Sequence, residues 1–181
     1  PGNGCGGGGG VKEDALRDAG LVLSAYGQGE GIYDRILCDV PCSGDGTLRK
    51  DLKVWDKWTP LFGLQIHRLQ VQIAMRGLAL LKVGGIMAYS TCSFNPIEDE
   101  AVVADLLRRT KGAIELVDAS EMVPALVRRP GWKTWKVLDE DLHQWESYSD
   151  TQDKTVPAPR RHLFSPSMWP SSARGKSEED T

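Results

Sequence analysis

Short runs of consecutive apolar residues recur along the chain, and longer stretches with apolar residues at helical spacing separate them. The segment YDRILCDV (33–40) contains the uninterrupted apolar run ILC, without the alternation of a half-exposed strand. Such a run is typical of a strand that is covered on both faces of a parallel sheet. The segments GIMAYST (85–91) and AIELVD (113–118) are predicted to form two further strands.

A long helix is predicted between the first two strands. Thr59 and Pro60 form a good helix start, because threonine can cap a helix and proline suits the first helical position. The predicted helix ends at Gly84-Gly85. Apolar residues recur near helical spacing between these points: Leu61, Leu64, Leu69, Ile73 and Leu81. His67 lies inside this helix, and no cysteine or carboxylate is spaced to join it. We therefore expect an exposed or hydrogen-bonded histidine rather than a metal ligand.

A second helix is predicted to start at Asn95-Pro96. The acidic run EDE (98–100) falls in its first turn, and Arg108 and Arg109 lie near its end. This polarity complements the helix dipole.

The order of strands and helices indicates an α/β fold with a right-handed crossover between parallel strands. In such sheets, ligands bind in the crevice at the carboxyl ends of the strands. Asp39 and Cys42 follow the first strand, and Thr91 and Cys92 follow the second. If the two strands are neighbours, two thiols and one carboxylate meet in a single crevice.

The length of 181 residues is sufficient for one domain. The glycine tract at residues 1–10 is expected to be disordered, since it lacks the preceding strand that a phosphate-binding loop requires. A short helix over residues 11–19 and a weaker hairpin between residues 132 and 145 are also predicted. Serine, proline, arginine and acidic residues dominate after that, so residues 150–181 are expected to form a largely disordered tail.

Composition and charge narrow the function classes. The net charge of −3 and a pI near 5.7 count mildly against a protein that only binds nucleic acid. Basic residues do cluster at 108–111, 128–136 and 160–162, and the simplest interpretation of each cluster is a solvated surface or a helix end. No apolar run is long enough to span a membrane.

The four cysteines are expected to be free thiols. No signal peptide is recognisable in the sequence, which suggests a reducing compartment. The cysteines also lack C-x-x-C spacing with nearby histidines, so no structural zinc site, and no metal site in general, is predicted.

Two thiols at matching strand ends suggest chemistry rather than packing. A nucleophilic thiol is activated at a helix N-terminus or beside a cation. Cys92 lies just ahead of the predicted second helix, and Arg49 and Lys50 follow Cys42. A cysteine hydrolase would need a histidine base, and no histidine is placed for that role. A redox pair remains open, although such pairs usually have C-x-x-C spacing.

Four segments together resemble a known family: ILCDVPCSGDGTLRKD, LQIHRLQVQIAMRGLALLKVGG, YSTCSFNPIEDEAVV and GWKTWKV. The resemblance is to the Nop/Sun (RsmB/NOP-type) family of S-adenosylmethionine-dependent RNA cytosine-5 methyltransferases, and within it to the eukaryotic tRNA-methylating branch. It covers roughly residues 33–138, with a fainter echo at RRHLFSPSMWP. The two specific motifs are D-x-P-C and S-T-C-S followed by N-P-x-E-D-E.

The resemblance implies an α/β class I methyltransferase fold, here a partial Rossmann-like sheet with helices on both faces. It also implies S-adenosyl-L-methionine as cofactor and RNA, most of all tRNA, as substrate. It assigns Cys92 as the nucleophile that adds to carbon 6 of cytosine, and Cys42 as the residue that assists release of the product. DNA cytosine methyltransferases attack from the P-C position instead, so the T-C match favours RNA. Asp39 matches the motif aspartate beside the cofactor and the target base. An intracellular location, in the nucleus or nucleolus, is also implied.

The family pattern also has an earlier half, which contains the glycine-bearing cofactor loop. That half is not recognisable before Tyr33, so we expect a partial chain in which residues 11–149 form the catalytic part of the methyltransferase domain. The alternative hypothesis is a non-catalytic fragment or paralogue that only binds RNA or a protein partner. The oligomeric state is left open.

Overall fold

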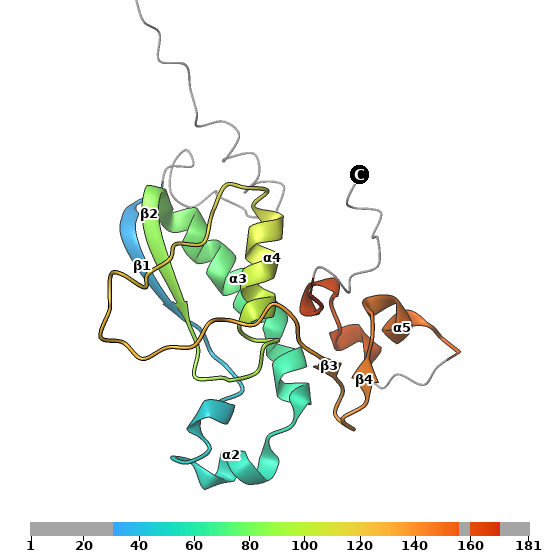
Figure 1. The fold of residues 1–181 in the computed structure, drawn as a ribbon. Helices are drawn as coiled ribbons and strands as arrows, with labels where there is room; N and C mark the ends of the chain where they lie inside the picture. The colour runs from blue at the N-terminus through green and yellow to red at the C-terminus, as the bar shows by residue number, and fades with distance from the viewer. Residues whose placement is uncertain (1–30, 156–159, 171–181) are drawn as a thin grey trace, which may run out of the picture.

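A parallel pair of strands lies at one side of the structure (Figure 1), a computed structural model that describes residues 31–155 and 160–170. Strand β1 (Tyr33–Asp39) pairs with β2 (Leu81–Ser90), and Asp39 lies beside Ser90 at their carboxyl ends. The connection between them contains the short helix α2 (Leu52–Lys57) and the long helix α3 (Pro60–Leu80) (Figure 1). The predicted strand–helix–strand unit is therefore present. The predictions for residues 1–30 lie outside the described residues.

Helix α3 begins where the sequence predicts and ends earlier. Thr59 has the extended conformation of an N-cap residue, and Pro60 is the first helical residue. The helix ends at Leu80, before the predicted stop at Gly84-Gly85, because the chain passes directly into β2. Gly84 instead has a φ of 80° at the irregularity where the register between β1 and β2 shifts.

Helix α4 (Glu100–Arg109) packs beside α3 (Figure 1) but begins later than predicted. Residues 96–99 form turns, and Asp99, with φ −115° and ψ −90°, lies outside helical geometry. The prediction of a regular helix from Asn95-Pro96 is therefore wrong by one turn, and the buried side chain of Glu98 lies in the turn that precedes the helix. At the other end, Arg108 and Arg109 form ion pairs with the buried carboxylate of Asp105.

The first hydrophobic core lies between the strand pair and these two helices. Its buried members are Cys38, Val40, Val71, Ala74, Met75, Leu78, Val102 and Leu106. On the opposite face of β1, the side chain of Leu37 is 74% exposed. An α/β architecture is thus present, but within the described ranges no helix covers that second face. The expectation of helices on both faces is not met there.

The segment 113–118 is not a strand, which corrects the prediction from the sequence. Ile114 packs against the first core, whereas Leu116 is 70% exposed and Val117 is 49% exposed. A segment with a suitable hydrophobic pattern forms a strand only where it can pair with the edge of a neighbouring strand. In the described residues the parallel sheet contains only β1 and β2, and this segment pairs with neither.

A second hydrophobic core lies beside the first. Strands β3 (Val137–Leu138) and β4 (Gln144–Trp145) form the predicted hairpin, and helix α5 (Tyr148–Gln152) follows. The buried members of this core are Leu64, Ile97, Val137, Trp145, Phe164, Met168 and Trp169. None of the described helices is long and apolar enough to cross a membrane.

The second core corrects the expectation of a disordered tail for residues 150–155 and 160–170. Phe164, Met168 and Trp169 are at most 1% exposed, because burial of large aromatic side chains outweighs the turn-forming serines and prolines around them. His67 joins this segment to the rest of the molecule. Its ring nitrogens hydrogen bond with the carbonyl oxygen of Ile97 and the hydroxyl of Ser167, at 2.7 Å each. The prediction of a hydrogen-bonded histidine is therefore confirmed.

Candidate active site

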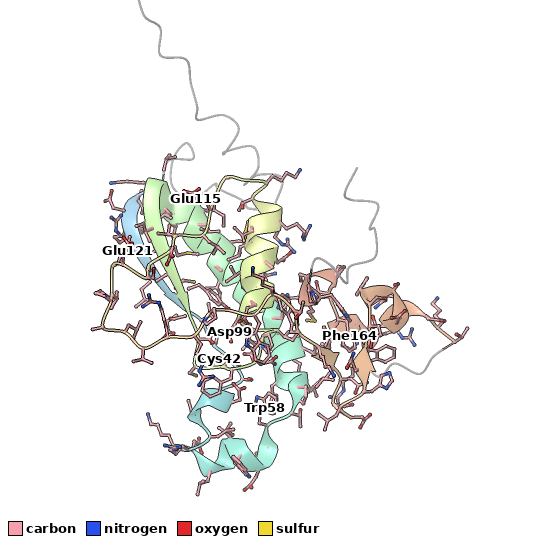
Figure 2. All side chains as sticks on the ribbon, in the orientation of Figure 1. Cys42, Trp58, Asp99, Glu115, Glu121 and Phe164 are labelled. Atoms are coloured by element: carbon pink, nitrogen blue, oxygen red, sulfur yellow. The ribbon has the colours of Figure 1, made fainter. Side chains whose placement is uncertain are left out.

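The two thiols predicted to meet at the strand ends do so. The Sγ atoms of Cys42 and Cys92 lie 2.8 Å apart, in the loops that follow β1 and β2. Cys92 is exposed and Cys42 is half-buried. Figure 2 shows Cys42 below the strand pair, in the loop that follows β1. Two nucleophilic atoms are thus presented at the edge of the sheet where ligands bind in α/β folds.

Asp39 lies at the same edge, as the last residue of β1. Its Oδ1 atom accepts a hydrogen bond of 2.8 Å from the hydroxyl of Ser90, the last residue of β2. The side chain is exposed, and its Oδ2 atom accepts no hydrogen bond from any described residue. One carboxylate oxygen is therefore fixed, and the other is free to accept a hydrogen bond from a ligand.

The two thiol loops are held against each other by hydrogen bonds from backbone amides. The amide of Gly46 donates to the carbonyl oxygen of Cys92 at 2.9 Å, and the amide of Phe94 donates to Oδ1 of Asp45 at 2.9 Å. A Cβ atom on Gly46 would lie 2.3 Å from the carbonyl oxygen of Cys92. Glycine is required at this position because any side chain would separate the loops.

Glu98 is the main polar link between the loops, and its role was missed in the sequence analysis. Its fully buried carboxylate accepts hydrogen bonds from the amide and hydroxyl of Ser43, beside Cys42, and from the hydroxyl of Ser93, beside Cys92. Gln70 of α3 donates to the same carboxylate at 3.1 Å and to the carbonyl oxygen of Pro41 at 2.9 Å. In the sequence, Glu98 stands in a run of three acids that resembles an ordinary helix start, which concealed this function.

A second carboxylate, that of Asp99, is hydrogen-bonded to the Cys92 loop. Asp99 accepts a hydrogen bond of 2.7 Å from the hydroxyl of Thr91. Burial raises the pKa of Asp99 to about 6, and the neighbouring carboxylates of Glu100 and Glu98 act in the same direction, although the bond from Thr91 opposes them. The residue next to the exposed thiol is thus tied to a group that titrates in the mildly acidic range.

The thiol of Cys42 is not activated by the cations that follow it in sequence. Burial and then the hydrogen bond with Cys92 raise its pKa to about 11. The side chains of Arg49 and Lys50 are exposed and make no ion pair or hydrogen bond with this thiol. Cys42 therefore keeps its proton at neutral pH and can donate a hydrogen bond to the Sγ atom of Cys92.

The described residues contain no group of three histidine, cysteine, aspartate or glutamate side chains that could hold a metal ion. The polar groups that the site offers to a ligand are the two thiols and the free oxygen of Asp39. This donor set suits covalent chemistry on an organic substrate.

Comparison with known proteins identifies the family. Residues 17–148 match the family model described as 16S rRNA methyltransferase RsmB/F. The multisite-specific tRNA:(cytosine-C(5))-methyltransferase trm4b of Schizosaccharomyces pombe is 51% identical over 139 residues, which are 76% of this chain and 19% of that protein. The tRNA (cytosine(34)-C(5))-methyltransferase of Drosophila melanogaster is 44% identical over 138 residues, which are 76% of this chain and 18% of that protein.

An archaeal relative is also similar. The tRNA (cytosine(49)-C(5))-methyltransferase of Pyrococcus abyssi is 32% identical over 167 aligned positions, and the match covers 81% of this chain and 49% of that protein. The chain spans about a fifth of the length of the two eukaryotic relatives. Because the family model covers most of the chain, including both thiol loops, the chain belongs to the RsmB/F family of methyltransferases.

Proposed function

We propose that this chain carries the catalytic thiols of an RNA cytosine-5 methyltransferase that acts on tRNA. The observation that carries the proposal is the pair of thiols, with 2.8 Å between the Sγ atoms, beside the carboxylate of Asp39 at one sheet edge. Membership of the RsmB/F family supports it, and so do the names of the relatives, which describe tRNA cytosine-C5 methylation.

Cys92 acts as the nucleophile in this proposal. Its thiol is exposed, whereas that of Cys42 is half-buried, so a base that enters from solvent reaches Cys92 first. The Cys92 thiol loses its proton to solvent, and the thiolate adds to carbon 6 of cytosine as ring nitrogen 3 takes up a proton. The resulting enamine makes carbon 5 nucleophilic. S-adenosylmethionine, when bound, supplies the methyl group that carbon 5 takes up. The target base has to leave its stack to reach these atoms.

Cys42 acts in product release. Because burial keeps its pKa high, it holds a proton beside the Sγ atom of Cys92. As the bond between carbon 6 and Cys92 breaks, Cys42 gives this proton to the departing sulfur. In the same elimination carbon 5 loses its proton to the Cys42 sulfur, so the double bond between carbons 5 and 6 forms again and both thiols are restored.

Asp39 orients the base. Its free Oδ2 atom can accept a hydrogen bond from the exocyclic amino group or the protonated ring nitrogen of cytosine, while Ser90 holds its Oδ1 atom. The same exposed carboxylate fits one contact with the cofactor, whose remaining contacts are not assigned to described residues. A carboxylate fixed at this point stabilises the positive charge of the protonated ring nitrogen while the thiolate adds.

A trapping experiment tests the nucleophile. An RNA with 5-azacytosine at the target position has no carbon 5 proton to lose, so the adduct cannot be released. We expect this RNA to attach covalently to the protein that contains this chain, and Cys92→Ala to abolish the attachment. Cys38→Ala, which removes a buried thiol of the first core, is the matched control and should leave the attachment intact.

Attachment that survives Cys92→Ala would overturn the assignment of the nucleophile. RNA that binds without forming any adduct would instead favour the alternative hypothesis, a family member that binds RNA without catalysis.

A further inference from the structure

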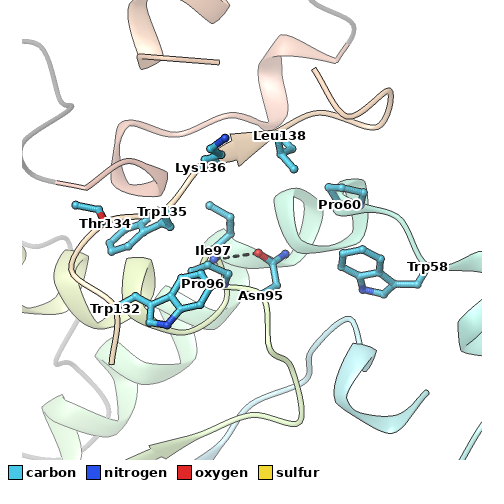
Figure 3. A pocket seen from close by; sticks show the side chains of 10 residues that line it. All are labelled: Trp58, Pro60, Asn95, Pro96, Ile97, Trp132, Thr134, Trp135, Lys136 and Leu138. Atoms are coloured by element: carbon cyan, nitrogen blue, oxygen red, sulfur yellow. Dashed lines mark hydrogen bonds between the residues drawn. The ribbon is translucent and has the colours of Figure 1, made fainter. Parts of the chain in front are cut away.

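A pocket lined by three tryptophans opens beside the thiol loops. Its volume is about 620 Å³, within the range of about 300–1,000 Å³ that is typical of small-molecule sites. Figure 3 shows Trp58 on one side, Trp132 and Trp135 on the other, and Asn95 between them. We call this site the tryptophan pocket. None of its lining residues has a role in the proposed reaction.

Two of the three indole rings of the pocket are held in place by hydrogen bonds. Trp58 donates from Nε1 to the hydroxyl of Ser43 at 2.8 Å, and Trp135 donates from Nε1 to the carbonyl oxygen of Met168 at 2.7 Å. The backbone amide of Trp132 donates to Glu100 at 2.9 Å, while the Trp132 side chain remains 65% exposed. Aromatic faces that are already fixed can stack on a planar ligand at a small cost in conformational entropy.

The polar groups of the pocket suit a nucleotide. Lys136 is exposed at the rim, and no carboxylate lines the pocket. Asn95 uses its Oδ1 atom to accept from the amide of Ile97 at 3.1 Å, and its Nδ2 atom donates to no described residue. The pocket thus combines three features that bind a nucleotide: a cation for the phosphate, an amide donor for the edge of a base, and aromatic faces on which the base can stack.

We propose that the tryptophan pocket binds a nucleotide that flanks the target cytosine in the substrate RNA. This inference rests on the proposed function. The pocket is continuous with the thiol loops, because Trp58 bonds to Ser43, the neighbour of Cys42, and Asn95 lies three residues after Cys92. An RNA strand with its target base at the thiols therefore passes this pocket with an adjacent base. The site fixes the register of the strand while the target base is out of its stack.

Binding measurements on a matched pair of variants test the pocket. The probe is a single-stranded RNA with one cytosine, and the protein is the whole protein that contains this chain. Trp132→Ala should weaken binding by about 5- to 150-fold, the range expected for loss of one stacked base. Trp55→Ala is the control, since Trp55 is 68% exposed but lies outside the pocket, and it should bind within about twofold of the parent.

A crosslink identifies which nucleotide occupies the pocket. RNA with 4-thiouridine immediately before or after the cytosine should crosslink, at one of these two positions, to Trp58, Trp132 or Trp135. Equal binding by the Trp132→Ala and Trp55→Ala variants would overturn the proposal, and so would crosslinks that all map outside the pocket. Either result would leave a peptide or a small molecule as the occupant.

The adduct on Cys92 and the crosslinks in the pocket are measured separately, so failure of the nucleotide site can be distinguished from failure of the proposed function. Pocket crosslinks without a 5-azacytosine adduct would mean that catalysis fails and the nucleotide site stands. An adduct without pocket crosslinks would mean that catalysis stands and the nucleotide site fails.

Discussion

Two side chains at the candidate active site, Cys42 and Asp99, have pKa values that burial shifts upwards. The two shifts have different consequences near neutral pH. Cys42 keeps its proton, because a pKa of about 11 lies far above neutrality. Asp99, with a pKa of about 6, carries a negative charge at neutral pH, and the folded protein then holds this charge in a partly buried position. Its charged state is therefore less favourable in the folded protein than in the unfolded chain.

The titration of Asp99 predicts a pH-dependent stability difference. A carboxyl group with a pKa of 3.8 in the unfolded chain and about 6 in the folded protein binds more protons when folded. Its contribution to the free energy of unfolding therefore falls as the pH rises from about 4 to about 6. The amide of an Asp99→Asn variant can still accept the bond from Thr91 but carries no charge. We expect this variant to gain stability relative to the parent across that interval, measured by urea denaturation on both sides of it.

Asp118 provides the control for this measurement. Hydrogen bonds from Ser120 lower the pKa of Asp118. The stability of the Asp118→Asn variant relative to the parent should therefore fall as the pH rises through the acidic range, opposite to the change expected for Asp99→Asn. The account of Asp99 is wrong if the difference between Asp99→Asn and the parent is the same at pH 4 and pH 7.

At the scale of elements, the site consists of two loops held together by groups that only the tertiary structure assembles. The sequence predicts that Cys42 and Cys92 converge, because residues that follow neighbouring parallel strands share one sheet edge. It does not predict Glu98, whose burial depends on Ser43 and on Gln70, residues far away in the chain. Residues 113–118 are a second example. Their apolar pattern favours a strand, but the pattern gives no information on whether a partner strand lies beside them.

The central position of Glu98 predicts a large loss of stability in a conservative variant. In Glu98→Gln, the amide nitrogen replaces an acceptor that faces donors from Ser43, Ser93 and Gln70. Loss of hydrogen bonds to a buried charge should lower the free energy of unfolding by about 2–3 kcal/mol, measured by urea denaturation. The covalent attachment of 5-azacytosine RNA to Cys92 should also fall, since both thiol loops loosen.

Glu115→Gln is the matched change at an exposed position and should remain within about 0.5 kcal/mol of the parent. Equal stabilities of the Glu98→Gln and Glu115→Gln variants would show that the buried carboxylate does not hold the loops.

At the scale of the whole molecule, two hydrophobic cores meet along α3. Leu64 belongs to the second core and Val71 to the first, and His67 lies between them on the same helix. The serines and prolines of residues 160–170 suggest turns when the sequence is considered locally. Local turn propensity gives no information on the distant residues against which the aromatic side chains of this segment pack, so its part in the second core is not predicted from the sequence. Helix α3, which carries Gln70, therefore packs against both hydrophobic cores.

The central claim is the division of labour between the two thiols, and one measurement tests both assignments together. The Cys42→Ala variant of the protein that contains this chain is incubated with S-adenosylmethionine and an RNA that carries ordinary cytosine, and covalent products are mapped by mass spectrometry. We predict that an RNA adduct accumulates on Cys92, because the thiol that assists release is missing. Normal turnover without an adduct, or an adduct on any residue other than Cys92, would contradict the account.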